Sequence, residues 1–306
     1  MASPITGQLA RAGFAYAGYN HASTVFTALA APILEVEQGE RFILEARSLL
    51  TGGFFEAGEY EKCSIPVTGP VVVHGARPGD ALRVDLHDIR VADRGAMVTL
   101  PGRGGFGEPL GRFGHVVEID DGGVHFADGV AIPVRPMVGK LGVAPADGEP
   151  SSSTVGPYGG NMDCNDVTAG SAVILPVQAD GARLFAGDLH AAQGDGECSL
   201  TGVEVEGSVT LSCRVLPGVA VRRPVVLSAG RVITIGDGDD LDAAALAALD
   251  DMLELVVVDR SWSREKAAML LSAAADVAVS QLVNARASVK VSLAEEYFLH
   301  SPFSPA

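Results

Sequence analysis

The sequence predicts a mainly β protein, with a β-sandwich or β-barrel body and a small α/β part at the C-terminal end. Three observations predict this fold class. Gly and Pro are frequent, with 37 and 17 among 306 residues, and they separate short apolar runs in the way that tight turns do. Several of these runs alternate apolar and polar residues, which is the period of a strand with one solvated face. Ala- and Leu-rich segments gather only after about residue 236.

The first two thirds of the chain predict repeated β-hairpins. Three pairs of runs are expected to form them: 33–37 with 40–45, 71–74 with 81–89, and 202–205 with 208–215. In the fourth of these runs Leu82, Val84 and Leu86 alternate with polar residues, so one face of that strand is expected to be solvated. Repeated hairpins of this kind are typical of sandwiches and barrels.

The last quarter of the chain predicts helices. Two aspartates, Asp239 and Asp240, precede a predicted helix at 241–255, where acidic residues cap free amides and suit the helix dipole. Ser263 precedes a second predicted helix at 264–283, and a short strand is expected at 288–293. The predicted regions are therefore an N-terminal β-sandwich (1–135), a β-barrel-like region with the site motifs (136–235) and an α/β region (236–306).

The charge of the chain excludes some partners. There are 38 acidic and 22 basic residues, which gives a net charge of −16. Such a surface repels phosphate backbones and anionic lipid, so we expect neither a nucleic-acid partner nor a membrane partner. The four cysteines form no CxxC pair and are expected to be free thiols in a reducing cytosol: Cys63, Cys164, Cys198 and Cys213. A soluble, cytoplasmic protein is the resulting prediction.

Residues 159–197 concentrate the side chains that carry chemistry. GGNMDCND at 159–166 and GDLHAAQGDGE at 187–197 place an imidazole and several carboxylates on turns flanked by glycine. Nitrogen and oxygen ligands of this kind are typical of a zinc-type site. Asp188 and His190 are two residues apart, so on a strand both would face one side and could bind one ion. Turn formation is the alternative explanation, because Asp bonds its own backbone and Gly accepts positive φ.

These two motifs, in this order, are similar to the paired signature of the acetamidase/formamidase family. Further similar segments are VTGPVVVHGARPGDALRVDLHDI at 67–89, RPMVGKLGVAP at 135–145 and SREKAAMLLSAAADVAVSQLVN at 263–284, so the resemblance spans most of the chain. It implies a hydrolase of linear amides that releases ammonia and a carboxylate, and a homo-oligomer (a dimer or tetramer). It also implies a divalent metal, zinc in the first place, with calcium as the alternative.

The resemblance also implies which residues form the site: Asn161, Asp163, Asp188, His190, Gln193, Asp195 and Glu197. We expect Asp163, Asp188 and His190 to bind the metal. Glu197, or in second place Asp195, is expected to be the general base for a metal-bound water that attacks the amide carbon. Asn161 and Gln193 are expected to orient the small amide substrate, with turn hydrogen bonds as the alternative role.

Departures from the family pattern bear on the substrate. Where many relatives begin with a His–x–x–Trp element, this chain has His21 without a tryptophan, and His21 is a further candidate metal ligand. Ser48 and Leu49 stand where relatives often have Asp and an aromatic residue, and Tyr158 replaces a histidine before Gly-Gly-Asn. Tyr158 is therefore a candidate substrate-binding residue, and an amide larger than formamide or acetamide is expected.

Two alternative functions stay open at this point. The same metal apparatus could act on a cyclic amide or another C–N bond. A non-catalytic metal- or ligand-binding β-protein is the alternative outside the enzymes, although a pure binder would need no general base.

Overall fold

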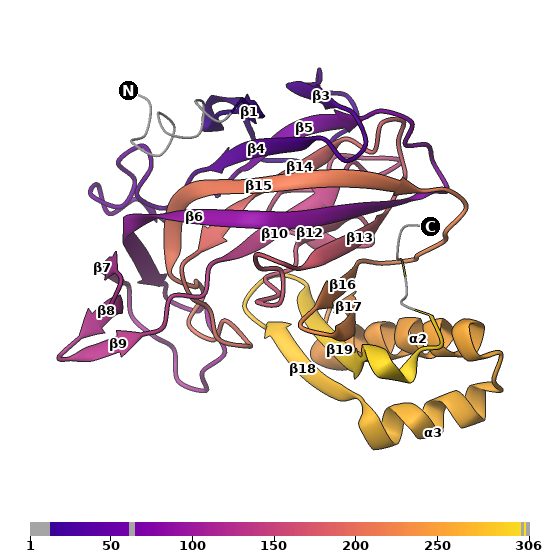
Figure 1. Cartoon of the computed structure of the whole chain (residues 1–306). Helices are drawn as coiled ribbons and strands as arrows, with labels where there is room; N and C mark the ends of the chain where they lie inside the picture. The colour runs from indigo at the N-terminus through magenta and orange to yellow at the C-terminus, as the bar shows by residue number, and fades with distance from the viewer. Residues whose placement is uncertain (1–12, 61–64, 301–302, 304–306) are drawn as a thin grey trace.

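The computed structural model describes residues 13–60, 65–300 and 303. Within these residues the chain forms 19 strands and two α-helices, and the helices lie near the C-terminal end. The strands belong to one hydrogen-bonded sheet that curls on itself (Figure 1). The predicted mainly β fold with a small α/β C-terminal part is thereby confirmed.

The elements follow one another along the chain without long helical interruptions before residue 241. The first strands are β1 (Ala15–Ala17), β2 (Ala22–Ser23), β3 (Leu34–Val36), β4 (Arg41–Ala46), β5 (Val67–Val73), β6 (Ala81–Thr99), β7 (Phe113–Asp120), β8 (Gly123–Ala127) and β9 (Val130–Ile132). The middle strands are β10 (Met137–Val143), β11 (Val155–Gly156), β12 (Gly159–Asn161), β13 (Ala172–Pro176), β14 (Leu184–His190) and β15 (Glu204–Leu216). The last elements are β16 (Val225–Ser228), β17 (Arg231–Gly238), α2 (Leu241–Arg260), α3 (Arg264–Ala274), β18 (Asp276–Gln281) and β19 (Ala287–Ala294).

Two long strands, β6 and β15, form the centre of the sheet and cross the middle of Figure 1. Antiparallel partners extend the sheet from them: β4 and β14 pair with β15, and β7 and β13 pair with β6. β14 also pairs with β5 along the edge that it shares with β15 and with β10 along its opposite edge, and β10 pairs in turn with β12. Strands from both sides of residue 135 are therefore hydrogen-bonded to one another, across the boundary predicted between the first two regions.

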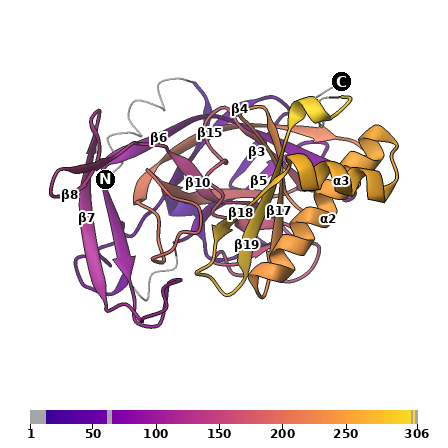
Figure 2. The same cartoon turned by 90° about the horizontal axis from the view of Figure 1, so that it is seen from below.

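The hydrophobic core has a main part inside the curled sheet and a second part under the helices. Phe26 and Phe185 are fully buried in the main part, with ring centroids 5.4 Å apart in an edge-to-face arrangement. In the second part Met252 and Val256 of α2 pack with Val291 of β19. Seen from below, the helices lie at one end of the molecule beside β17, β18 and β19, and β7 and β8 lie at the other (Figure 2).

The predicted hairpins are wrong in their pairing, although the runs are strands. β3 pairs in parallel with β5, and β4 pairs with β1 and β15. β5 pairs with β14, and the run at 81–89 lies within β6, beside β13 and β15. The runs at 202–205 and 208–215 are joined in β15, because Gly207 continues the strand through a register shift. A Cβ atom on Gly207 would lie 2.1 Å from the Arg90 carbonyl oxygen, so the glycine allows a close strand approach.

The predicted helices begin where expected but end elsewhere. Asp240 accepts a hydrogen bond from the Ala243 amide, and Ser263 accepts one from Lys266, so both N-caps are confirmed. α2 continues to Arg260, whereas α3 ends at Ala274 and 276–281 is the strand β18. Alternating valines and the pairing with β19 favour a strand there.

Two smaller expectations concern thiols and membranes. Cys164, Cys198 and Cys213 are free, as predicted, and Cys63 lies outside the described residues. Neither helix in the described part of the chain has the length and apolar character required to cross a bilayer.

Candidate functional site

The ends of four neighbouring strands bring the polar residues of the sequence motifs together. Strand pairing places Lys140 of β10 opposite Asn161 of β12, and Met137 of β10 opposite His190 at the end of β14. His190 is in turn opposite Glu204, the first residue of β15. The loops that follow β12 and β14 add their side chains to the same place. The site therefore depends on strand register as much as on the motifs themselves.

Four carboxylates and one imidazole form the centre of the site, which we call the acidic cluster: Asp163, Asp188, His190, Glu197 and Glu204. Ligand atoms of Asp163, His190 and Glu197 lie within 4.8 Å of one another, and so do those of Asp188, His190 and Glu204. All five residues are buried. His190 belongs to both groups, so the predicted ligands Asp163 and Asp188 each lie close to it.

The acidic cluster has polar atoms that are buried without a hydrogen-bond partner among the described residues. These atoms are Asp163 Oδ1, Asp188 Oδ1, His190 Nε2, Glu197 Oε2 and Glu204 Oε2. His190 Nε2 lies 3.0 Å from Glu204 Oε1 and 3.7 Å from Asp188 Oδ1, yet it has no contact of hydrogen-bond geometry. Buried polar atoms are normally paired, because an unpaired one costs about 1–3 kcal/mol. A set of oxygen and nitrogen lone pairs without donors is the arrangement that a bound cation requires.

The donor set fits a divalent transition ion. Imidazole and carboxylate ligands are typical of zinc sites, whereas calcium sites take oxygen ligands alone. His190 Nδ1 lies 2.7 Å from Gln193 Oε1, and Gln193 Nε2 donates to the Asp163 carbonyl oxygen over 2.6 Å. Since Gln193 Oε1 can only accept, Nδ1 carries a proton, so Nε2 is the nitrogen that faces the carboxylates and can bind an ion once it is deprotonated. Such an outer hydrogen bond commonly fixes the tautomer of a metal-binding histidine.

Two glycines allow this close packing. A Cβ atom on Gly139 would lie 2.7 Å from Asp163 Oδ1, and a Cβ atom on Gly202 would lie 2.6 Å from His190 Nδ1. Real Cβ atoms do not approach so closely, so any side chain at either position would displace a residue of the acidic cluster.

The carboxylates are held by hydrogen bonds that leave one oxygen of each directed inward. Asp163 Oδ2 accepts from Asn161 Nδ2 over 2.8 Å and from Asn284 Nδ2 over 3.3 Å. Glu197 Oε1 accepts from the Gly202 amide over 3.0 Å. Asp188 Oδ2 lies 3.1 Å from Lys140 Nζ, which also donates to the Ile65 carbonyl oxygen over 2.7 Å. Three of the four unpaired carboxylate oxygens of the acidic cluster are the second oxygens of these same groups.

Backbone strain accompanies the site. Asp163, Asp188 and Glu197 have φ values of +46°, +59° and +48°, in the left-handed region that favours glycine. A non-glycine residue is held there at a cost of about 1–3 kcal/mol, and such residues gather at functional sites. Three acidic residues of the cluster therefore have an unfavourable backbone conformation, which places their carboxylates at a cost to local stability.

The acidic cluster holds four carboxylates close together in a buried space, and burial and mutual repulsion shift their pKa values. Burial, followed by repulsion from Asp188, raises the pKa of Asp163 to about 7. Burial also raises the pKa of Glu204 to about 8 and, together with the Asp163 charge, holds the pKa of Glu197 well above its usual value. Burial alone would raise the pKa of Asp188 too, but Lys140 and His190 hold it below its usual value. Burial alone would lower the pKa of His190, but the negative charges of Glu204 and Asp188 outweigh this and raise it well above its usual value.

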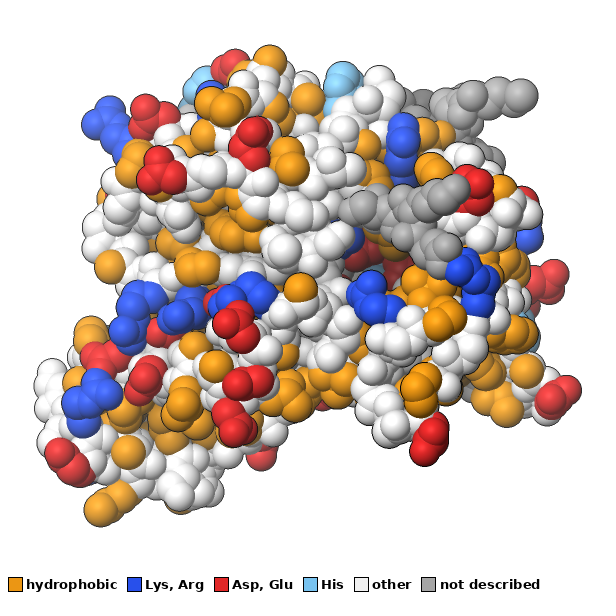
Figure 3. All heavy atoms as spheres, turned by 180° about the vertical axis from the view of Figure 1, so that it is seen from behind, with side chains coloured by type: hydrophobic (Ala, Val, Ile, Leu, Met, Phe, Trp, Pro, Cys, Tyr) orange, Lys and Arg blue, Asp and Glu red, His pale blue; other side chains and the backbone are white. Residues whose placement is uncertain are grey.

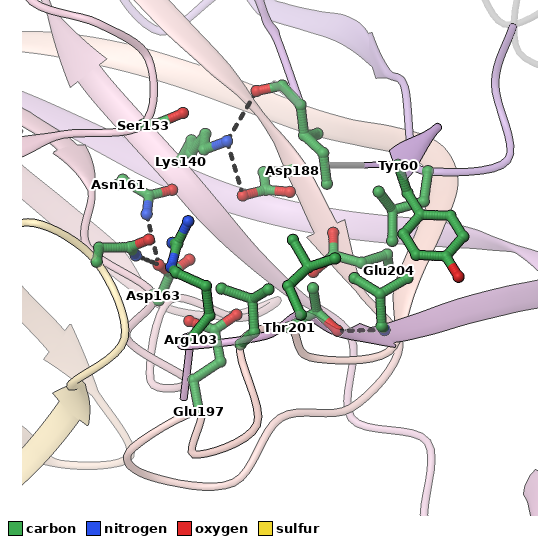
Figure 4. Close-up of a pocket in the computed structure, with 16 residues that line it drawn as sticks. Tyr60, Arg103, Lys140, Ser153, Asn161, Asp163, Asp188, Glu197, Thr201 and Glu204 are labelled. Atoms are coloured by element: carbon green, nitrogen blue, oxygen red, sulfur yellow. Dashed lines mark hydrogen bonds and ion pairs between the residues drawn. The ribbon is translucent and has the colours of Figure 1, made fainter. Parts of the chain in front are cut away.

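A cavity of about 320 Å³ opens onto the acidic cluster. Figure 4 shows polar side chains around this space, labelled Lys140, Asn161, Asp163, Asp188, Glu197 and Glu204. On the opposite face from Figure 1, acidic side chains are visible in a recess bordered by basic and hydrophobic ones (Figure 3). The cavity is large enough for a small organic substrate beside a metal ion.

Some predicted residues lie outside the acidic cluster. His21 is exposed and its Nε2 lies 3.5 Å from Asn20 Nδ2. Tyr158 is buried, bonds to Thr154 over 2.8 Å and packs on Phe26. Asp195 is half exposed, and its carboxylate forms an ion pair of 2.7 Å with Lys290. These three residues are not among those that line the cavity.

Two residues of the site were not predicted from the sequence. Glu204 opens a strand in which polar and apolar residues alternate, a pattern typical of a strand with one solvated face, so nothing in the sequence distinguishes it. Lys140 is the only charged residue of β10, whose seven residues are all buried. A lone lysine in a buried apolar strand is a usable signal, because a buried cation requires a partner. Nothing in the sequence indicates that the partner is Asp188.

The comparisons with known proteins agree with these motifs. The model of the Acetamidase/Formamidase family matches residues 148–298. A crystal structure of an acetamidase from Bacillus halodurans is 35% identical with a TM-score of 0.89, over 92% of this chain and 98% of that one. The structure of a protein from Thermoanaerobacter tengcongensis, described as an acetamidase/formamidase, is 35% identical with a TM-score of 0.88, over 92% and 96% of the two chains.

The likeness to a curated relative covers a shorter segment. A protein of Schizosaccharomyces pombe described as a formamidase is 45% identical over 74 residues, which are 22% of this chain and 18% of that protein. The aligned segment therefore spans less than a fifth of that relative's length.

Proposed function

The chain belongs to the acetamidase/formamidase family, and from this premise we propose that it hydrolyses a carboxamide to a carboxylate and ammonia. Membership confirms the resemblance that the paired motifs suggested. The observation that carries the proposal is a set of five buried ligand atoms without hydrogen-bond partners among the described residues, whose side chains form two groups that share His190 beside a cavity. A stabilising role alone does not explain atoms that are buried at a cost and left without donors.

We propose that Asp188, His190 and Glu204, whose ligand atoms lie within 4.8 Å of one another, hold a divalent metal ion, with Asp163, which lies as close to His190, as a fourth ligand. The imidazole in this set favours zinc over calcium. A bound ion of this kind would polarise the amide carbonyl group and lower the pKa of a coordinated water molecule.

Glu197 is the proposed general base. Its Oε1 is held by the Gly202 amide, and its Oε2 is unpaired beside the cavity. In this position Oε2 can accept the proton of a water molecule that attacks the amide carbon. The protonated Glu197 can then donate that proton to the departing nitrogen, since an amide nitrogen leaves poorly without one.

Lys140 and Asn161 are proposed to orient the substrate. Lys140 Nζ lines the cavity while it contacts Asp188 and Ile65, so its ammonium can stabilise negative charge on the carbonyl oxygen. Asn161 donates its Nδ2 to Asp163, and its Oδ1 is buried without a donor among the described residues. That oxygen is placed to accept a hydrogen bond from the substrate NH₂ group.

The experiment that tests the proposal measures ammonia release and metal content together. Linear amides and a lactam are supplied to the protein as purified, after chelation, and after zinc is restored. We expect ammonia release from a linear amide, loss of turnover with loss of metal, and recovery with zinc. Unchanged ammonia release after verified removal of the metal would overturn the metal-dependent reaction.

Two other outcomes separate the alternative functions. Opening of the lactam, without release of ammonia from any linear amide, would favour the cyclic-amide alternative. Absence of any turnover while the metal is bound would favour a binding protein. The expected homo-oligomer and cytoplasmic location stay predictions, for light scattering and cell fractionation to test.

A further inference from the structure

The cavity beside the acidic cluster has a second, apolar wall. Its members are contributed by separate segments of the chain: Leu49, Tyr60, Ile65, Val98, Leu100 and Leu200. We call these six residues the apolar wall. None of the proposed catalytic steps uses them, so their presence in the cavity requires another explanation.

Five of the six residues of the apolar wall, all but Leu100, belong to a small hydrophobic cluster or pack against it. Leu49, Ile65 and Val98 are buried and pack together with Ala96, and Leu200 packs against them. Because Val98 is in β6 and neighbouring Ala96 is opposite Glu204 in the strand register, this wall is anchored directly beside the acidic cluster. A wall built from packed core residues is a fixed surface rather than a set of adjustable side chains.

The size of the cavity argues against the smallest amides. Its volume of about 320 Å³ is room for roughly ten water molecules, at about 30 Å³ each. Formamide has only three non-hydrogen atoms and acetamide four, so either would leave the apolar wall in contact with water. An apolar group on the acyl carbon would displace that water and gain the hydrophobic contact.

The charge around the cavity argues against an anionic acyl group. The carboxylates of Asp163, Asp188, Glu197 and Glu204 lie along its polar wall, and they repel a carboxylate on the acyl group of the substrate. Two cations, Lys140 and Arg103, also line the cavity, but the four carboxylates outnumber them. Arg103 Nη2 donates to the neutral Val283 carbonyl oxygen over 3.3 Å. The apolar wall itself carries no ionisable group except the Tyr60 phenol.

We propose that the substrate is a primary amide with an uncharged, apolar acyl group of about four to six carbon atoms, which binds against the apolar wall. This inference rests on the proposed function, because it assumes that the amide group reacts at the acidic cluster. The apolar wall then determines specificity, and the acidic cluster determines the reaction.

A series of amides tests the inference on the unmodified holoenzyme. The readout is kcat/KM for ammonia release from formamide, acetamide, propionamide, butyramide, valeramide, hexanamide and succinamate. Each buried methylene is expected to raise kcat/KM roughly fourfold, from about 0.8 kcal/mol per CH₂, until the cavity is filled. Succinamate is expected to react more slowly than butyramide, which has the same number of carbon atoms.

Two failures are distinguishable in this series. A maximum at formamide or acetamide, or a preference for succinamate over butyramide, would overturn the apolar substrate and leave the amidase function intact. Ammonia release from none of the amides would instead refute the proposed function.

Substitutions in the apolar wall provide a second test. Val98→Thr keeps the shape of the side chain but replaces one methyl group with a hydroxyl group, so the ratio of kcat/KM for valeramide to that for acetamide should fall about three- to tenfold. Val116→Thr, in β7 and outside the cavity lining, is the matched control and should leave the ratio unchanged. Leu100→Thr, at a partly exposed position, serves if Val98→Thr fails to fold. An unchanged ratio in the folded wall variants would remove the apolar wall from substrate recognition.

Discussion

Two groups of buried carboxylates lie in this protein, and they differ in how their charge is balanced. In the C-terminal region Asp237 and Asp251 are both buried, and each contacts arginines. Asp237 Oδ2 lies 2.7 Å from Arg286 Nη2, and Asp251 Oδ2 lies 3.3 Å from Arg223 Nη1. We call these four residues the arginine network. Two guanidinium groups there face two carboxylates. Arg222 pairs in addition with Asp251, and Asp239 pairs with Arg286, which adds one charge of each sign, so the charges cancel locally.

The acidic cluster lacks this balance. Four carboxylates share one imidazole and the Lys140 ammonium, and the inward oxygens have no donors among the described residues. Charges that cancel locally can be buried for stability, whereas an excess of one sign requires protons or a cation. We therefore interpret the arginine network as a structural element and the acidic cluster as a cation site maintained for chemistry.

The largest expected effect is that of removing one charge from the acidic cluster. Glu197→Gln should lower kcat about 10²- to 10⁴-fold, the usual contribution of a general base. Metal content and folding should be retained, because Glu197 is not among the proposed ligands. Steady-state kinetics with metal analysis provide the measurement.

The matched control for this variant is Asp195→Asn. Asp195 is near Glu197 in the sequence, but it pairs with Lys290 and does not line the cavity beside the acidic cluster. Its substitution should leave most of the activity. If Asp195→Asn lost as much activity as Glu197→Gln, the assignment of the base would be wrong.

The excess negative charge predicts two opposite effects of pH. As the pH rises, the metal-free protein should lose stability, whereas its affinity for the metal should increase. The pKa values of Asp163 (about 7) and Glu204 (about 8) are above their unfolded values, so in the metal-free form these groups bind protons that the unfolded chain has lost. Their contribution to stability is complete below about pH 4 and is lost as the pH rises through 7 to 8. Metal binding displaces these protons, so affinity should rise about tenfold per pH unit for each proton displaced.

Calorimetry in buffers of different ionisation enthalpy measures this proton release, and thermal unfolding measures the stability of the metal-free form. We expect protons to be released on binding, and the metal-free melting temperature to fall between pH 5 and 8. Binding of zinc without proton release would contradict the interpretation of the acidic cluster.

A smaller effect is expected from the residue that orients His190. Gln193→Leu removes the acceptor of the Nδ1 proton and should weaken metal affinity about 10- to 100-fold. Gln193→Glu keeps an acceptor and should retain more of the affinity than Gln193→Leu. The control is Gln178→Leu, since Gln178 accepts a hydrogen bond from the Ala146 amide at an exposed site away from the acidic cluster. Equal metal affinity in the Leu and Glu variants of Gln193 would exclude this orienting role.

The smallest effect is expected in the arginine network, and on stability rather than on turnover. Asp237→Asn should lower the free energy of unfolding by about 1–3 kcal/mol, because Arg223 and Arg286 lose a charged acceptor. Asp276→Asn, at an exposed ion pair with Arg231, should change it by less than about 0.5 kcal/mol. Urea unfolding measures both. If Asp237→Asn lost turnover per folded molecule, the interpretation of the arginine network as a purely structural element would be wrong.

The motif residues could be predicted from the sequence because they lie in two short, contiguous segments. Asp188 and His190 are two residues apart in one strand, and Asp163 follows the Gly-Gly-Asn turn. Glu204 and Lys140 could not be assigned in this way. Each reaches the site through strand pairing, since β15 and β10 lie on either side of β14. His21 and Tyr158 were predicted as site residues from their positions beside family motifs, but neither of them lines the cavity.

By itself, the sequence determined the fold class, the helix starts and the family, because these depend on local composition, capping residues and contiguous motifs. Only the tertiary structure decided the strand partners, the members of the acidic cluster and the apolar wall. The physical reason is that strand register joins residues far apart in the chain: Glu204 is opposite both His190 and Ala96. Whether a carboxylate is solvated on a strand face or buried against an imidazole follows from that register.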